Sequence, residues 1–556
     1  MYNLIKKSMK KLTFIVAFTL MVNAAFSIGL LTNNNQSAQF IRMMSRNASL
    51  DIDAVYYNPA GLIKLENGWH FAINNQTIIQ TKHIDSKFPL LNDGKYQGDV
   101  FAPIFPTGFA VYKKDKWAFS FGFGPNAGGG TATFDRGLPS FEIPISKIPS
   151  ALAGLALVDP SLAVSGYDVD LKFDGSSIYW GLQVGATYKV NEVFSVYGGV
   201  RYMPAKNTYQ GTIKNIQLKT TDGLQPAPAW LNQTSGTLSG YAAMSQAGAD
   251  MPQTLQPIVD GGGGAYTLGQ LEGAGYIDAT QRAGIEGGLK LMGLPQDQID
   301  VMDLNTVQGA YVVAAPTFQE NANKLNATAG ALSATADQLG DKEVDVEQTG
   351  AGFTPILGLN ISPNENINIG LRYEHKTYLT LKNATKVDDL GMFPDGADVN
   401  SDIPGILGVG IGYTDNDWFE VQLSYNMTFD KGVDWGNNIR SEAQREIENN
   451  SYDIGLGLQY NISKKFSISA GGVYNDYGIA DSYQSDFSWA NSSVAIGGGI
   501  MWKISDQLTL DAGILNVFYQ DSEVTFIDPD LQAPYKETYG KETITFALGL
   551  SYSIFK

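Results

Sequence analysis

Apolar residues alternate with small or polar residues in the last segment of the chain. Within residues 541–556, every second position from Ile544 to Ile554 is apolar, and the positions between them are Thr, Ala, Gly or Ser. A period of two is typical of a β-strand whose two faces meet different environments. Because the apolar face is continuous, the pattern favours lipid on one side and a polar or tightly filled lumen on the other.

Three internal segments repeat this alternation, at residues 177–189, 367–379 and 418–429. In the last of them, Glu420 and Gln422 lie on the face opposite a run of apolar residues. A soluble β-sandwich would alternate in the same way. The length of these segments and an N-terminal export signal favour a membrane barrel instead.

The connections between the alternating segments are short and long in turn. Short polar turns lie at 113–116, 190–193, 362–366, 414–417, 463–465 and 505–507. Long connections lie at 83–103, 127–176, 218–346, 383–403, 431–450, 480–489 and 527–540. Short turns on one rim and long loops on the other are typical of barrels in the bacterial outer membrane.

Six turns and seven loops join fourteen strands, so the sequence predicts an all-β fold: a transmembrane antiparallel β-barrel. The expected strands are 69–82, 104–113, 116–126, 177–190, 193–217, 347–361, 367–382, 404–414, 418–430, 451–462, 466–479, 490–504, 507–526 and 541–556. The barrel region is therefore 69–556, including the large extracellular loop 218–346. Both ends of the barrel fall on the short-turn, periplasmic side.

The first 27 residues are expected to be a signal peptide. Lys6, Lys7, Lys10 and Lys11 precede the apolar stretch 12–22, which is short for a membrane span. The mature chain is expected to begin near Ile28; a signal anchor is the alternative. After residue 27 no run of eighteen apolar residues follows, and the chain has no Cys for a disulfide framework.

Composition and charge exclude several classes of function. A net charge of −18 makes nucleic acid an unsuitable partner. The hydrophobic fraction of 44% fits strands that are apolar on only one face. No metal site, cofactor or catalytic residue is predicted. An outer-membrane hydrolase is an alternative function, but the chain has only three His, and no nucleophile motif surrounds His375.

Residues 28–68 precede the first strand and do not alternate. They are too apolar for a disordered tail, as Phe40, Ile41, Met43 and Met44 illustrate. Because the chain enters the barrel from the periplasmic side, we expect this segment to fold back into the lumen as a plug.

The large loop contains one regular pattern. Four apolar residues recur every seven positions, which predicts a narrow stripe along a helix of about five turns. They are Phe318, Leu325, Leu332 and Leu339. The stripe either packs on another helix of the same loop or forms one wall of an apolar groove that binds ligand; the two interpretations are compatible.

Three motifs in order carry a family resemblance: NNQSA at 34–38, NPAGL at 58–62 and RYMPAKNTYQGTIKN at 201–215. With them, the whole mature chain resembles the FadL/TodX family of outer-membrane transporters for long-chain fatty acids and other hydrophobic compounds. The terminal strand also resembles those that the barrel-assembly machinery reads, although Phe555 is followed by Lys556.

The resemblance implies a monomeric transporter in the outer membrane of a Gram-negative bacterium, in contact with outer-membrane lipid and lipopolysaccharide. It implies capture of a hydrophobic small molecule on extracellular loops, passage into an apolar lumenal pocket, movement of the plug and exit through the barrel wall. A general diffusion porin is the alternative. The residues expected in the plug or gate are Asn34, Gln36, Ser37, Asn58, Pro59, Ala60 and Gly61.

The third expected strand is a candidate for the opening in the wall, since Pro and Gly interrupt it. The residues concerned are Phe121, Gly122, Phe123, Gly124, Pro125, Asn126, Gly128, Gly129 and Gly130. A kinked strand leaves backbone groups of its neighbours unpaired in lipid, which a port would explain. Alternatively, the strand ends at Gly124 and the later glycines belong to a loop.

Several charged residues point to the lumen by parity. Arg201, Arg372 and Lys376 are candidates for binding a ligand carboxylate. The alternative is that they and Glu374 neutralise one another and hydrate the wall.

Overall fold

The computed structural model describes residues 33–415, 418–435 and 444–555. The expected signal peptide, the expected cleavage site and Lys556 lie outside the described residues. The described chain forms two compact units. One comprises residues 147–169 and 215–340; the other comprises the remaining described residues, with the barrel and the segment before it.

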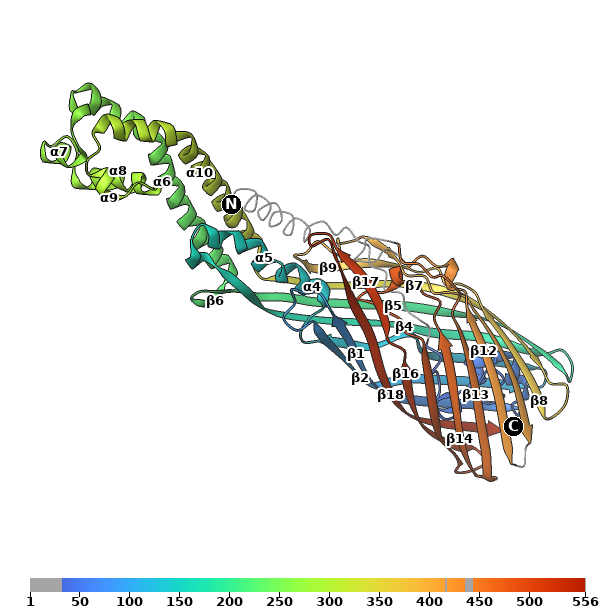
Figure 1. Cartoon of the computed structure of the whole chain (residues 1–556). Helices are drawn as coiled ribbons and strands as arrows, with labels where there is room; N and C mark the ends of the chain where they lie inside the picture. The colour runs from blue at the N-terminus through green and yellow to red at the C-terminus, as the bar shows by residue number, and fades with distance from the viewer. Residues whose placement is uncertain (1–32, 416–417, 436–443, 556) are drawn as a thin grey trace. The chain divides into compact units, whose positions relative to one another are not determined.

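The barrel unit is a closed antiparallel β-barrel of fourteen strands, which confirms the predicted fold class. It closes where β1 pairs with β18 on one side and β2 on the other (Figure 1). The strands are β1 Gly68–Ser86, β2 Lys95–Lys114, β3 Trp117–Phe134, β4 Val164–Lys189, β5 Phe194–Thr220, β6 Gly223–Pro226, β7 Lys342–Ile361, β8 Ile367–Glu374, β9 Thr380–Asp388, β10 Asp398–Asn400, β11 Ile406–Asp415, β12 Phe419–Thr428, β13 Tyr452–Ser463, β14 Phe466–Asp476, β15 Ser493–Lys503, β16 Leu508–Tyr519, β17 Ser522–Asp528 and β18 Ala533–Phe555.

The number of strands in the wall is smaller than the number of strand labels, because some wall strands are broken into two labelled segments. β9 continues β8 along β7, and β17 continues β16 along β18. Similarly, β10 pairs with β9 as β11 pairs with β8. β6 is a short hairpin partner of β5.

The outer face of the barrel is apolar, as the alternation predicts. On β18, Phe546 and Leu548 are 44% and 61% exposed, whereas Thr545 and Ala547 are buried. On β12, Leu423 is exposed while Gln422 and Ser424 are buried. Apolar side chains therefore face lipid, and small or polar side chains face a filled lumen.

Five of the six expected turns lie where one strand ends and the next begins; the sixth, 414–417, includes residues 416–417, which are outside the described residues. Several strands are longer than expected at the opposite end. β2 begins at Lys95 rather than 104, β4 at Val164 rather than 177, and β18 at Ala533 rather than 541. These extensions are wrongly assigned to loops by the sequence pattern because strand pairing beyond the lipid does not require strict alternation of apolar and polar residues. The expected strand 367–382 is broken after Glu374.

The segment before β1 folds into short helices whose residues are nearly all buried. They are α2 Ala38–Arg42, α3 Ala54–Tyr57 and the 3₁₀ helix η1 Pro59–Lys64. Ile41, Val55 and Leu62 form one hydrophobic cluster with Phe109 of β2 and Leu515 of β16. We call described residues 33–64 the plug.

The other helices are α4 Pro139–Ser146, α5 Ile148–Leu152, α6 Ala227–Asp260, α7 Leu268–Gly273, α8 Ala279–Leu291, α9 Gln296–Ile299 and α10 Leu304–Gln338. Short 3₁₀ helices lie at η2 Ala153–Leu157, η3 Pro160–Leu162, η4 Gly263–Ala265, η5 Asp430–Gly432 and η6 Asp481–Tyr483. None of the helices in the described chain is both long enough and apolar enough to cross a membrane.

Within the unit of residues 147–169 and 215–340, which we call the helical unit, α10 packs along α6, which confirms that the stripe faces another helix of the same loop. Phe318 and Leu332 are buried there. A Cβ added at Gly248 of α6 would lie 3.1 Å from the Phe318 ring, so the glycine permits close packing of the two helices. A ligand-binding role for Phe318, Leu325, Leu332 and Leu339 stays a prediction.

Candidate functional site

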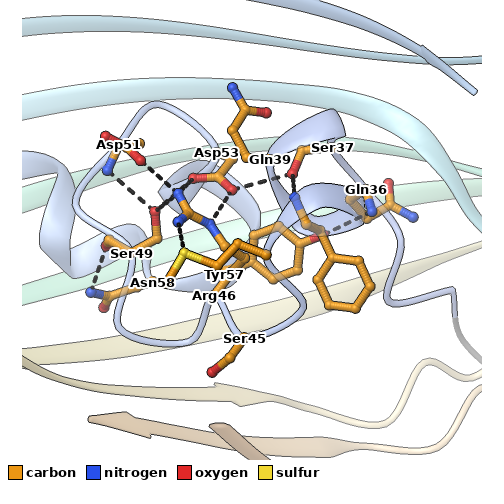
Figure 2. Close-up of polar contacts among 12 residues, drawn as sticks. Gln36, Ser37, Gln39, Ser45, Arg46, Ser49, Asp51, Asp53, Tyr57 and Asn58 are labelled. Carbon is orange, nitrogen blue, oxygen red and sulfur yellow. Dashed lines mark hydrogen bonds and ion pairs between the residues drawn. The ribbon is translucent and has the colours of Figure 1, made fainter. Parts of the chain in front are cut away.

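The plug is held together by a cluster of charges around the buried Arg46 and Asp53, drawn in Figure 2. Arg46 Nε lies 2.8 Å from Asp53 Oδ2, and its Nη2 lies 2.7 Å from Asp51 Oδ2. Ser49 Oγ donates to Asp53 Oδ1 at 2.6 Å. Ser37 Oγ donates to the same carboxylate and accepts from Phe40 N–H, which caps α2. The cluster ties the start of the plug to its middle.

The NNQSA motif packs against α3 through Tyr57. Tyr57 Oη donates to Asn34 O at 2.6 Å and accepts from Gln36 N–H at 2.8 Å. This hydroxyl therefore bridges two predicted plug residues. The polar residues of the motif satisfy backbone groups that a buried, irregular segment would otherwise leave unpaired.

Bonds from the plug to lumen-facing side chains fix it against much of the wall. Arg42 Nε pairs with Asp511 of β16 at 2.7 Å, and both side chains are 2% exposed. Asn58 Nδ2 donates to Asn360 of β7 at 2.7 Å. Asn34 Nδ2 donates to Asp453 of β13 at 2.9 Å.

The NPAGL motif lies against strands β4 and β5. Thr187 Oγ1 donates to Pro59 O at 2.7 Å, and Ser195 Oγ donates to Ala60 O at 2.8 Å. Gly61 is buried where a Cβ would lie 2.9 Å from Ser49 O. The motif is thus a tight contact between the plug and the wall, and its role in gating stays a prediction.

Two of the three predicted lumenal cations contact the plug. Arg201 Nη1 lies 2.6 Å from Glu374 Oε2, and Arg372 Nε lies 3.4 Å from Glu374 Oε1. Both guanidinium groups lie over the Tyr56 ring, and Arg372 donates to Tyr56 O. The side chains of this cluster neutralise one another in part, as the alternative interpretation expected.

Lys376 lies apart from that cluster. Its Nζ is 2.7 Å from Asp402 Oδ2 and donates to Gly432 O at 2.7 Å. Ligand binding by Arg201, Arg372 or Lys376 stays a prediction.

Strand β3 continues through its glycines to Phe134 rather than ending at Gly124. Gly128, Gly129 and Gly130 have φ of 72°, 148° and 84°, conformations that other residues rarely adopt. A Cβ on Gly128 would collide with Ser177 O of β4. The strand is therefore kinked where the sequence places its glycines.

Pairing between β2 and β3 is interrupted at this kink. Val100 pairs with Ala132, and the next paired residues are Gly108 and Phe123. The two strands between these points carry Pro103, Pro106 and Pro125, which have no N–H to donate. On the other side, β3 stays paired with β4 except for two irregularities, at Pro125/Ala127 and Gly128/Thr131.

The start of the plug is bonded to the kinked strand. Asn33 Nδ2 donates to Gly128 O at 2.6 Å, and Gln36 Nε2 donates to Pro125 O at 2.8 Å. Asn33 N–H donates to Asn126 O at 2.7 Å. The plug therefore bonds to backbone carbonyls of β3 at the place where its pairing with β2 is interrupted.

The other residues predicted for the lateral opening point alternately to the outer and the inner face of the barrel wall. Phe121 is 41% exposed on the outer face, and Phe123 stacks on Trp180 with ring centroids 5.0 Å apart. On the inner face, a Cβ on Gly122 would lie 2.9 Å from Val55, and one on Gly124 would lie 2.8 Å from Gln36. The small residues leave room for the plug.

A lumenal cavity of about 410 Å³ borders both the plug and the kink. Asn33, Phe40 and Met44 line it from the plug, and Gly128, Gly129 and Gly130 line it from β3. The remaining lining mixes apolar side chains, such as Ile78, Phe105 and Leu515, with polar ones, such as Gln80, Asn475 and Thr543. A volume of this size suits a small amphipathic or apolar molecule.

The cavity also contains residues that the sequence analysis missed. Lys82 of β1 and Lys541 of β18 line it, with Trp489 between them. The parity of β1 and β18 could have placed both lysines in the lumen, but only the register of the two strands shows that they are neighbours. In the described chain no group of His, Cys, Asp or Glu is arranged to hold a metal ion.

Comparison with known proteins supports this architecture. Residues 303–554 match a family model described as outer membrane protein transport protein (OMPP1/FadL/TodX). No curated protein matches the chain. The crystal structure of a Pseudomonas aeruginosa FadL homologue is 14% identical, with a TM-score of 0.52, over 95% of this chain and 99% of that one. At this identity the likeness shows the fold alone.

Two toluene transporters are similar at lower TM-scores. The Ralstonia pickettii transporter TbuX is 14% identical over 94% of this chain and 99% of its own, with a TM-score of 0.47. The P. putida transporter TodX is 12% identical over 91% and 95%, with a TM-score of 0.46.

Proposed function

We propose that this chain is an outer-membrane transport protein that carries hydrophobic molecules passively across the outer membrane. The match of residues 303–554 to the OMPP1/FadL/TodX family model supports this proposal. Long-chain fatty acids or similar compounds are the proposed cargo. Extracellular loops capture the molecule, the lumenal cavity receives it, the plug moves, and the molecule leaves laterally near β3.

One observation supports this route most directly: the bonds from Asn33 and Gln36 to Gly128 O and Pro125 O. They join the plug to the strand whose pairing is interrupted, and the same glycines line the cavity. A molecule that enters the cavity therefore meets both the plug and the interrupted wall.

The hydrogen bonding of the β3 backbone gives the proposed exit a physical rationale. Backbone groups without a partner at membrane depth are costly, and the plug supplies partners for carbonyls of β3 where its pairing with β2 is interrupted. A shift of the plug weakens the wall at the point where the ligand lies. The ligand moves down its own gradient, so no energy source is needed.

Uptake of a radiolabelled long-chain fatty acid tests the proposal. The chain is expressed in a Gram-negative host that lacks its own outer-membrane fatty-acid transporter. Uptake should rise well above that of the empty host, with no increase in the uptake of small hydrophilic solutes.

Single-channel recording of the purified protein separates the alternatives. A wide, steady conductance in the intact chain would indicate a general diffusion porin and contradict the proposal. Release of fatty acid from phospholipid by the purified protein would indicate a hydrolase. The monomeric state and contacts with lipopolysaccharide or the assembly machinery stay predictions.

A further inference from the structure

Strand β2 bulges outward beside its interrupted pairing with β3. In the register with β1, Ala102 and Phe105 pair with residues that are only two positions apart, so Pro103 and Ile104 form a β-bulge. Ile104 is 73% exposed on the lipid-facing side, whereas Phe105 is 3% exposed. Because the bulge places two outward residues in succession, the alternation changes phase, and the next side chain, that of Phe105, lies on the inner side of the wall.

Two polar residues on the lipid-facing side of β1 hold this bulge. Asn75 Nδ2 and Thr77 Oγ1 donate to Pro103 O at 3.1 and 3.0 Å. Phe105 N–H donates to Asn75 Oδ1 at 3.1 Å. The two polar residues lie in the same outward row of β1 as Ile73, which is 67% exposed. Polar groups are costly in lipid unless they are bonded, and these bonds fix the backbone at Phe105 to β1.

The Phe105 ring fills part of the gap between β2 and β3. The pairing of the two strands is interrupted over residues 101–107 of β2. Gly129 of β3 has φ of 148°, and a Cβ added there would lie 3.0 Å from Phe105 Cε2. The ring therefore lies against the β3 backbone at the kink, in room that the glycine leaves. On its inner side the ring lines the lumenal cavity, into which it has space to turn.

A single aromatic side chain thus separates the cavity from the lipid where the strands are not paired. We propose that Phe105 closes the interrupted wall and sets the width of the molecule that can leave through it. Because its backbone is anchored to β1, a turn of the side chain about χ1 toward the cavity opens the gap without moving β2. The inference rests on the proposed lateral exit and names the side chain that limits it.

The test compares the uptake of two acids that differ in width. One is radiolabelled hexadecanoic acid, and the other is a fatty acid that carries a pyrene ring at the end of its chain. Both are given to the host described above, with equal amounts of each full-length variant in the outer membrane. Phe105→Ala should raise the uptake of the pyrene acid relative to hexadecanoic acid severalfold, and Phe105→Trp should lower it. All strains share the steps that follow the outer membrane, so differences in this ratio come from the barrel.

Phe101→Ala is the matched control. Phe101 lies on the same strand but is 66% exposed on the lipid-facing side, so its loss should leave the ratio at the wild-type value. Because the chain has no Cys, a thiol can be placed at either position alone. Phe105→Cys should admit the pyrene acid, and labelling with N-phenylmaleimide, which restores an aromatic ring after the barrel has assembled, should reduce its uptake again. The same treatment of Phe101→Cys should leave the ratio unchanged.

The outcomes separate this inference from the proposed function. If the wild type takes up hexadecanoic acid but Phe105→Ala keeps the wild-type ratio, the inference is overturned and transport stands. Complete labelling of Phe105→Cys, verified by mass, without an effect on the pyrene acid would overturn it as well. If the wild type takes up neither acid above the empty host, the proposed function fails together with the inference. Should Phe105→Ala not assemble, Phe105→Cys with and without the maleimide decides the question.

Discussion

At the scale of single residues, buried ion pairs hold the plug in the barrel lumen. Arg42 and Asp511 are both 2% exposed, and Arg42 Nη1 also donates to Ser469 Oγ at 2.6 Å. Removing one partner of a buried ion pair leaves the other charge uncompensated, at a cost of about 3–5 kcal/mol. Replacing both partners with apolar residues is often neutral. The attachment of the plug should therefore depend on whether residues 42 and 511 are compatible with each other, rather than on either side chain alone.

Arg42→Ala should loosen the plug, because it leaves Asp511 buried without its counter-charge. We expect faster proteolysis of the N-terminal segment in the purified barrel and more frequent channel openings in planar bilayers. The double variant Arg42→Met with Asp511→Leu should recover most of the wild-type behaviour. If the single and double variants open equally often, the ion pair does not hold the plug.

At the scale of elements, the proposed lateral exit depends on the kink in β3. Straightening it with Pro125→Val, Gly128→Thr and Gly129→Thr would restore an N–H donor and favour extended backbone. Because Gly128 has φ of 72° and a Cβ there would collide with Ser177 O, the new side chains cannot adopt the present conformation. The variant should bind fatty acid but deliver little of it to the cell.

The controls for β3 separate a closed port from a damaged barrel. Gly198→Thr on β5 places the same side chain where a Cβ would meet nothing within 4 Å, so uptake should stay at the wild-type level. Both proteins should remain folded in detergent until boiled, as shown by a shift in gel migration. Wild-type uptake by a correctly assembled triple variant would count against lateral exit.

The stability of helix α10 in the helical unit should depend on pH. Asp303 Oδ1 accepts from Thr306 N–H at 2.8 Å and caps α10. Hydrogen bonds from the Thr306 side chain and N–H lower the pKa of Asp303. A lowered folded-state pKa means that the cap stabilises the helix above the unfolded-state pKa and loses this effect as pH falls through the folded-state pKa.

Asp303→Ala should therefore lower the melting temperature of the helical circular dichroism signal by a few degrees at neutral pH. The difference from the wild type should shrink in acid, where the wild-type carboxyl is protonated. Asp297→Ala is the matched control, since Asp297 lies inside the short helix α9 rather than at the cap of α10. A difference that persists unchanged into acid would show that the Asp303 charge does not act as the cap.

The elements differ in how well the sequence predicts them. Membrane strands such as β12 and β18 follow from alternation, because lipid outside and a packed lumen inside impose a strict period of two. The kink of β3 follows from Pro125 and its glycines. The extensions of β2 and β4 do not, since outside the lipid only backbone pairing is required.

Contacts between segments that are far apart in the sequence cannot be predicted from a hydrophobic pattern. Parity places Arg201, Arg372 and Glu374 in the lumen, but their contacts with Tyr56 depend on how the plug folds. In the same way, the pairing of Lys82 with Lys541 depends on closure of the barrel between β1 and β18. Such neighbours are separated by hundreds of residues and appear only when the barrel is closed.

At the scale of the whole barrel unit, the plug and the wall form one hydrogen-bonded structure. The plug bonds to lumen-facing groups on β4, β5, β7, β13 and β16 and to the backbone of β3. Glycines on the inner wall bring the two backbones together; a Cβ on Gly370 would collide with Asn47 O. The plug thus fills the part of the lumen that the cavity does not occupy. Without the plug, the barrel should have a wider opening and lose its selectivity.

Deleting residues 28–62 from the mature chain should convert the barrel into an open, unselective pore. The wall itself is closed by β1 and β18, which the deletion leaves intact, so the variant should still reach the outer membrane and shift on gels when boiled. Water should fill the space that the plug leaves, because polar groups such as Asp511, Asn360 and Asp453 would lose their partners in the plug and be hydrated instead. We expect a higher single-channel conductance, entry of small hydrophilic solutes and loss of selective fatty-acid uptake. A deletion variant that assembles but keeps the wild-type conductance would show that the plug does not block the pore, and movement of the plug could then not be the gate.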